Sequence, residues 1–102
     1  MKIEVKKQIA ATGPRYWVVS PLPEGMRSLL RSYQPGKPRV RDPHPLFQIA
    51  DGNSFQVSAL QEDRKAIINR SKEKNAPQAT RDELKALSAF LKSVIAACEA
   101  AR

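Results

Sequence analysis

The sequence contains few of the residues on which catalytic and metal sites depend. Its 102 residues include one cysteine, Cys98, and one histidine, His44. A zinc site needs about four nitrogen or sulfur ligands close together, so this pair does not make one. We expect His44, between two prolines, to be an ordinary loop residue. We expect Cys98, on an apolar helix face, to be a small core residue and not a nucleophile.

Glycine is scarce as well, and the four glycines are isolated from one another. This spacing excludes a glycine-rich loop of the kind that binds phosphate groups. The carboxylates are scattered over predicted helix starts and turns, so no pair is arranged for acid–base chemistry. We therefore expect no enzymatic activity, no bound metal and no cofactor.

Long apolar runs are absent, which excludes a membrane-spanning helix, and the first residues alternate instead of forming a signal-peptide block. A single cysteine cannot form an internal disulfide, which fits a reducing compartment, so we expect a cytoplasmic protein. An apolar fraction of 41% and a charged fraction of 27% are ordinary for a soluble protein. The length predicts one domain over residues 1–102.

The clearest pattern that is present lies at the C-terminus and predicts a long helix from Thr80 to Arg102. Thr80 and Glu83 have the spacing of a capping box, in which each side chain bonds a free backbone N–H group. Apolar residues then recur in steps of three and four: Leu84, Leu87, Leu91, Val94, Cys98 and Ala101. This face needs a partner, which is either the rest of the domain or a second copy.

The remaining chain predicts two hairpins, each followed by a helix. A first strand over 2–11 and a return strand over 16–19 flank a turn at 12–14; we expect Trp17 in the core and leave Tyr16 open. A short helix with an apolar stripe follows over 26–33. A second hairpin over 46–58, with a three-residue loop at 51–53, precedes a helix over 59–72 that is capped by Ser58 and Gln61.

This order predicts an α+β fold. We expect an antiparallel sheet of two hairpins, about four strands, with a short helix between them and two C-terminal helices, of which the last is long.

Charge is the one compositional outlier, at +8 overall. Residues 1–50 carry nine basic and three acidic residues, and residues 51–102 carry nine and seven. The irregular, proline-rich segment 34–45 contains Lys37, Arg39 and Arg41. In an extended chain, residues two apart project to one side about 6.6 Å from each other. That spacing is near the distance of about 7 Å between phosphates on one nucleic-acid strand.

These features predict a small nucleic-acid-binding protein, for DNA or RNA, that contacts the phosphate backbone through the basic loop and the helix before it. The predicted contact residues are Arg15, Arg27, Arg31, Lys37, Arg39 and Arg41. The alternative is a non-enzymatic adaptor or inhibitor that binds an acidic protein surface, with a homodimer through the C-terminal helix as a possible form. We expect no membrane partner.

Overall fold

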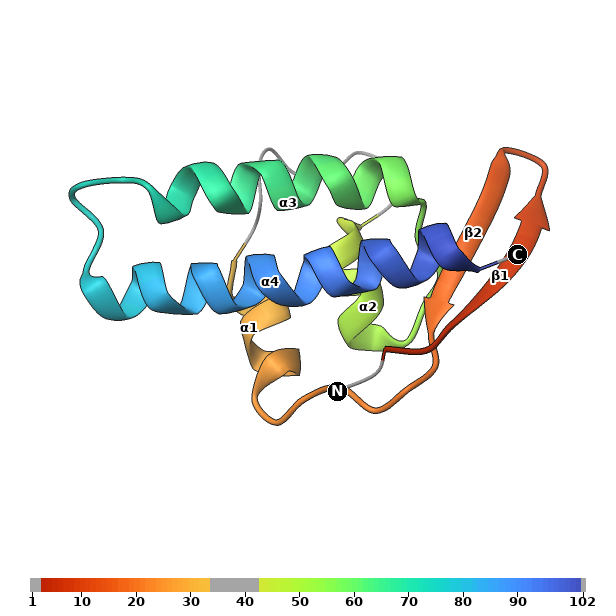
Figure 1. The fold of residues 1–102 in the computed structure, drawn as a ribbon, viewed down its shortest axis with the longest axis horizontal. Coiled ribbons are helices and arrows are strands. Elements are labelled where there is room, and N and C mark those ends of the chain that lie inside the picture. Colours follow the sequence, from red (N-terminus) through yellow and green to blue (C-terminus); the bar gives the residue numbers. More distant parts are fainter. Residues whose placement is uncertain (1–2, 34–42, 102) are drawn as a thin grey trace.

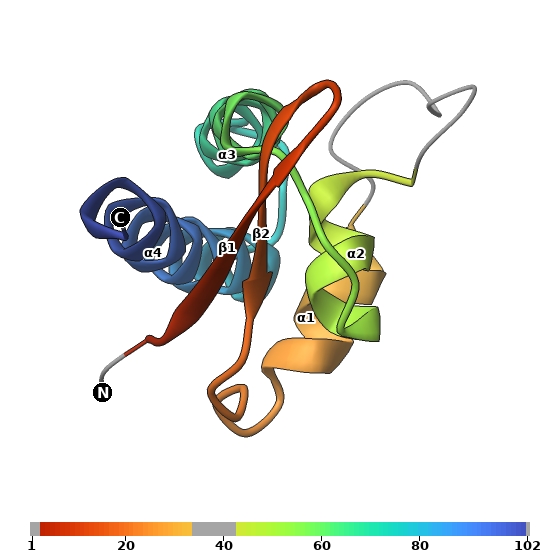
Figure 2. The same cartoon turned by 90° about the vertical axis from the view of Figure 1, so that its right-hand side faces the viewer.

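The computed structural model of the protein describes residues 3–33 and 43–101. Its elements are β1 (Val5–Ala10), β2 (Gly13–Val18), α1 (Met26–Ser32), α2 (Pro45–Asp51), α3 (Val57–Ser71) and α4 (Gln78–Ala100). Figure 2 shows α3 and α4 on one side of the molecule and α1 and α2 on the other. The predicted α+β class is confirmed. Within the described residues, however, the sheet has two strands where about four were predicted.

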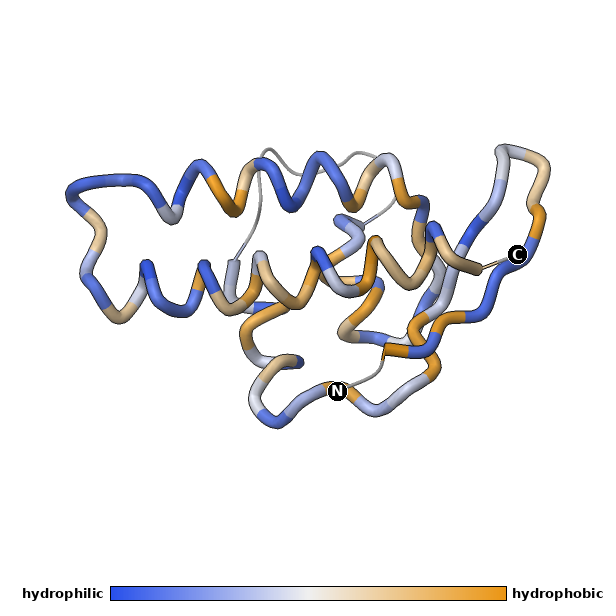
Figure 3. Tube along the Cα trace, in the orientation of Figure 1, coloured by the Kyte–Doolittle hydropathy of each residue, from blue (hydrophilic) through white to orange (hydrophobic). Residues whose placement is uncertain are grey.

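The helices α3 and α4 run side by side along the long axis of the molecule (Figure 1). Every third or fourth residue of α4 faces the core, and the side chains of Leu87, Leu91 and Val94 are fully buried. The connection between the two helices is mostly hydrophilic, with one short apolar stretch (Figure 3). The apolar face of α4 therefore packs against the rest of its own domain. The sequence had left open whether this face packs there or against a second copy.

The starts of both long helices lie earlier than predicted, and neither has a side-chain cap. The helix α4 begins at Gln78, after Pro77, and the side-chain amide of Gln78 donates to Asp82 Oδ1 over 2.8 Å. Thr80 therefore lies inside the first turn, and the predicted capping box is wrong. The helix α3 likewise begins at Val57, before the predicted cap Ser58.

The strands β1 and β2 form an antiparallel hairpin in which Ala10 pairs with Gly13. The turn is therefore Ala11–Thr12, and the prediction that placed it at 12–14 is wrong by about one residue. Gly13 has a φ of 117°, which suits glycine directly after so tight a turn. Pro14 lies opposite Ile9 within the strand, where its missing N–H group is not needed for the ladder with β1.

The aromatic pair of β2 is arranged opposite to our expectation. Tyr16 is 7% exposed and belongs to the core, whereas Trp17 is only half-buried. The backbone of Tyr16 bridges Phe55, and the two ring centres lie 6.5 Å apart. Because neighbouring strand residues face opposite sides, placing Tyr16 inward turns Trp17 outward.

The predicted second hairpin is wrong, since its first strand is the helix α2. Leu46, Ile49 and Ala50 have helical spacing and are all buried. Pro45 occupies the first turn, where a missing N–H costs nothing. Gly52, with φ of 76°, ends the helix in a left-handed conformation, and Asn53 N–H bonds Gln48 O over 2.8 Å. The predicted strand turn is thus the end of a helix. Of the predicted second strand, whose residues are all described, only Phe55 bridges the sheet.

Candidate nucleic-acid interface

The short helix α1 holds two of the predicted contact residues on its exposed side. Gly25, in a left-handed conformation, precedes the helix, and Met26 and Leu30 anchor it in the core. Arg27 and Arg31 are four residues apart, so their side chains lie one above the other on the surface. The structure therefore brings these two cations together on one side of α1.

Both arginines also bind the C-terminal end of α2. Arg27 Nε donates to the backbone oxygen of Ala50 over 3.0 Å, and the Arg31 guanidinium forms an ion pair with the Asp51 carboxylate. Cations are favourable at this end of a helix because free carbonyl groups gather there. The Arg31 side chain remains 57% exposed. These contacts orient the guanidinium groups and leave further N–H donors for a ligand.

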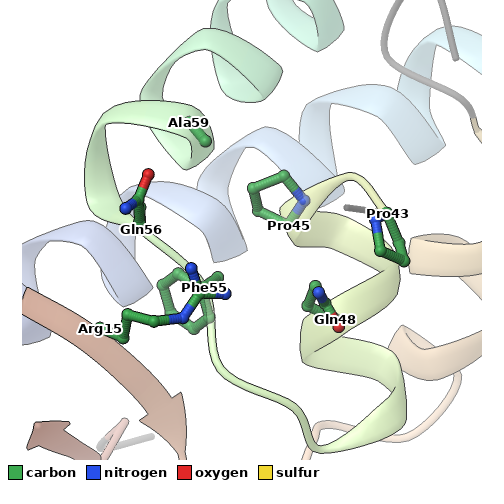
Figure 4. A pocket seen from close by; sticks show the side chains of 7 residues that line it. All are labelled: Arg15, Pro43, Pro45, Gln48, Phe55, Gln56 and Ala59. Atoms are coloured by element: carbon green, nitrogen blue, oxygen red, sulfur yellow. The ribbon is translucent and has the colours of Figure 1, made fainter. Parts of the chain in front are cut away.

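Arg15, on β2, lies apart from the α1 pair and bonds within its own fold. Its Nε donates to Ser54 Oγ over 2.8 Å, and a second guanidinium nitrogen donates to the backbone oxygen of Ser54 over 2.9 Å. Arg15 and Pro43 line a small cavity of about 20 Å³ (Figure 4). A volume of this size holds one water molecule, so the cavity is too small for a nucleotide.

The other predicted contacts, Lys37, Arg39 and Arg41, lie outside the described residues. The structure places the other three predicted contacts. Arg27 and Arg31 belong to the helix that ends just before residue 34, while Arg15 shares a cavity with Pro43, just after residue 42. The structure therefore places Arg27 and Arg31 on the element that precedes the basic segment in the chain, and Arg15 beside Pro43, the first described residue after it.

His44 is buried, and its expected role as an ordinary loop residue is wrong. The ring is 7% exposed, and its Nδ1 lies 3.0 Å from Oδ1 of Asp63, which is 4% exposed. The ring also meets Phe47 edge-on, with ring centres 6.1 Å apart. This contact joins the start of α2 to α3. Sequence reasoning missed it because the two residues are separated by 19 positions and by a misassigned helix.

The side chains of Tyr33 and Cys98 have shifted pKa values. The Tyr33 hydroxyl donates to Glu83 Oε2 over 2.7 Å, and this bond, with smaller effects of burial and of the nearby negative charge, raises the pKa of Tyr33. Burial, with a smaller effect of Glu99, raises the pKa of the Cys98 thiol to about 12. Cys98 is fully buried, so its prediction as a small core residue is confirmed.

Comparisons with known proteins add no relative. No family model, curated protein or solved structure matches this chain. In the described residues, none of the helices is both long enough and apolar enough to cross a membrane.

Proposed function

We propose that this protein binds nucleic acid through the phosphate backbone, without catalytic activity. The contact surface consists of Arg27 and Arg31 on α1 together with Lys37, Arg39 and Arg41 of the segment that follows. Arg15 adds positive charge beside the far end of that segment. Lysine and arginine contacts to phosphates give affinity with little dependence on base sequence.

One observation carries the proposal: two oriented, exposed arginines stand on the helix that leads into three more cations. Arg27 and Arg31 share the exposed side of α1, and α2 holds their guanidinium groups in place. A guanidinium that is already oriented loses less freedom when it binds a phosphate. Asp51 offsets one charge of this group, and the overall charge of +8 favours approach by any polyanion.

The experiment is a gel-shift titration with a random duplex and a random single strand across a range of salt concentrations. The logarithm of the binding constant should fall linearly with the logarithm of the salt concentration. A variant with Lys37→Ala, Arg39→Ala and Arg41→Ala should bind more weakly. Its slope should flatten by about 0.9 for each duplex phosphate contact that is lost.

The matched control removes the same number of charges from another surface. The residues Lys65, Lys72 and Lys74 are exposed on α3 and on the turn after it. Their triple alanine variant should keep most of the wild-type slope. If both triple variants lose affinity equally, binding depends on the total charge of the protein and not on the proposed contact surface. The proposed interface is then rejected.

A second candidate function is an adaptor that binds an acidic protein. It is favoured by the edge of β1 that lies away from β2, because the sheet of the described residues consists of these two strands. A homodimer through the apolar face of α4 is disfavoured, since Leu84, Leu87 and Leu91 are already buried within the chain. Such a dimer would require α4 to leave its own core.

A further inference from the structure

The hydrogen bonds of β2 determine which backbone groups of β1 point outward. Tyr16 N–H bonds the backbone oxygen of Phe55 over 2.9 Å, and Phe55 N–H bonds the backbone oxygen of Tyr16 over 3.0 Å. Both backbone groups of Tyr16 therefore point away from β1. Lys7 lies opposite Tyr16 in the hairpin, so the Lys7 N–H and C=O groups point away from β2.

The same alternation applies two residues further along, at Ile9. Along an antiparallel pair, the backbone N–H and C=O groups of successive residues point alternately toward the partner strand and away from it. Val19 N–H bonds the backbone oxygen of Glu4, which confirms that the even-numbered residues of β1 direct these groups toward β2. Lys7 and Ile9 thus form an outer edge with free donors and acceptors, and no hydrogen bond from the described residues reaches their backbone groups. Figure 1 shows β1 as the outer strand of the hairpin.

The side chains along this edge are open to solvent. The residues from Lys6 to Ile9 are all exposed, and Ile9 is 71% exposed, which is high for a large apolar residue. An exposed strand edge with an apolar side chain is a template on which another extended chain can pair.

Charge indicates which chain fits this edge. Over residues 3–20, the bases Lys6, Lys7 and Arg15 stand against the single acid Glu4. A second copy of β1 is a poor occupant. The antiparallel register that pairs all outward residues of both copies would place Lys7 opposite Lys7, and like charges directly opposite destabilise a strand pair.

We infer that the outer edge of β1 binds an extended acidic segment of another protein by adding it as a third strand. This inference deepens the adaptor function and rests on it, and it is independent of nucleic-acid binding at α1. The segment carries carboxylates opposite Lys6 and Lys7 and an apolar residue opposite Ile9. Lys7 and Ile9 share one face of the strand, so the partner's acidic and apolar residues on that face are two positions apart.

The probe is a labelled peptide with the sequence Thr-Val-Thr-Glu-Glu-Val-Thr, added to the full-length protein. Amide hydrogen exchange measured by NMR should show new protection at the Lys7 and Ile9 N–H groups. The Lys6 and Gln8 N–H groups already bond β2 and should change little. The same peptide with lysine in place of glutamate, or with methylated backbone nitrogens, should not protect these amides.

A pair of variants isolates the backbone contribution. Ile9→Pro removes one outward N–H group, while Ile9→Ala removes the same apolar side chain and keeps the N–H. Ile9→Pro should weaken peptide binding by about tenfold more than Ile9→Ala does, near the upper end of the effect of one hydrogen bond. Circular dichroism should show the same melting behaviour for both variants, because the hydrogen bonds between β1 and β2 are intact. Equal binding by the two variants would overturn strand addition.

The remaining outcomes separate the inference from the function on which it rests. Polyglutamate that binds without protecting Lys7 and Ile9 overturns the edge site and leaves the adaptor function standing. Failure of both polyglutamate and the peptide to bind rejects both. Protection of the same amides by raising the protein concentration alone identifies a second copy as the occupant, and so overturns the acidic partner.

Discussion

The helix α4 and the strand β1 both carry apolar residues among polar ones, but only α4 buries most of its apolar side. Leu87, Leu91 and Val94 of α4 have no exposed surface, whereas Ile9 of β1 is 71% exposed. The difference follows from their neighbours. The stripe of α4 meets α3 along much of its length, while β1 is bonded on one edge only by the part of the chain that the structure describes. Stability is therefore concentrated in the helical pair, and open binding groups are concentrated in the hairpin.

The prediction with the largest expected effect removes apolar side-chain volume from α4 and from β1. Leu91→Ala should lower the free energy of unfolding by about 3 kcal/mol, because a fully buried leucine leaves a cavity that the surrounding helices fill only in part. Ile9→Ala should change it by less than about 0.5 kcal/mol. Urea denaturation of both variants checks the contrast. Similar losses would mean that the hairpin contributes to the core as much as α4 does.

A second test compares two polar side-chain contacts of different burial. His44→Ala leaves the buried Asp63 carboxylate without its 3.0 Å contact and should cost about 2 kcal/mol. Arg31→Ala removes the exposed pair with Asp51 and should cost only about 0.2–1 kcal/mol. Thermal denaturation of both variants at one pH measures the difference. If Arg31→Ala proves the more damaging change, burial does not determine the contribution of these pairs.

The smallest expected effect concerns the contact of Tyr33 with Glu83, which ties the end of α1 to α4. The folded-state pKa of Tyr33 is raised above its usual 10.0, so the bond stabilises the fold below pH 10 and is lost as the pH rises beyond it. Tyr33→Phe should therefore lower stability by less than about 1 kcal/mol at neutral pH. Above pH 10, the variant and the wild type should converge. Denaturation midpoints across this range provide the measurement, and a constant difference would contradict the assigned bond.

The sequence predicted those parts of the fold in which local pattern and tertiary packing agree. The stripe of α4, the apolar anchors Met26 and Leu30 of α1, and the first hairpin all lie close to their predicted positions. In each case the spacing of the apolar residues along the sequence is enough to distinguish a helix from a strand. The predicted helix over 59–72 is likewise present as α3, beginning two residues earlier.

Prediction failed where one short pattern fits two structures. Phe47 and Ile49 alternate as in a strand, but Leu46, Ile49 and Ala50 also have helical spacing, and the core selects the helix. Asp51-Gly52 fits a hairpin turn and a helix C-terminus equally well. The contact between His44 and Asp63 forms only when the segment after His44 is the helix α2. A sequence interpretation that places a strand there cannot predict it.

The candidate site was predictable only in part. The spacing of Arg27 and Arg31 placed them together, as the structure does, but their attachment to Ala50 and Asp51 depends on α2. Arg15 was grouped with them from its charge alone, and the structure places it on β2, bonded to Ser54. A sequence shows how many basic residues are present. The hydrogen bonds of the folded chain determine which of these side chains are oriented and which keep free donors for a ligand.

The most direct test of the proposed function is the salt dependence of duplex binding for the two triple alanine variants. The variant of Lys37, Arg39 and Arg41 should show a clearly flatter slope than the wild type, and the variant of Lys65, Lys72 and Lys74 should not. Identical slopes for all three proteins, or no duplex or single-strand binding by the wild type at low salt, would contradict the proposal.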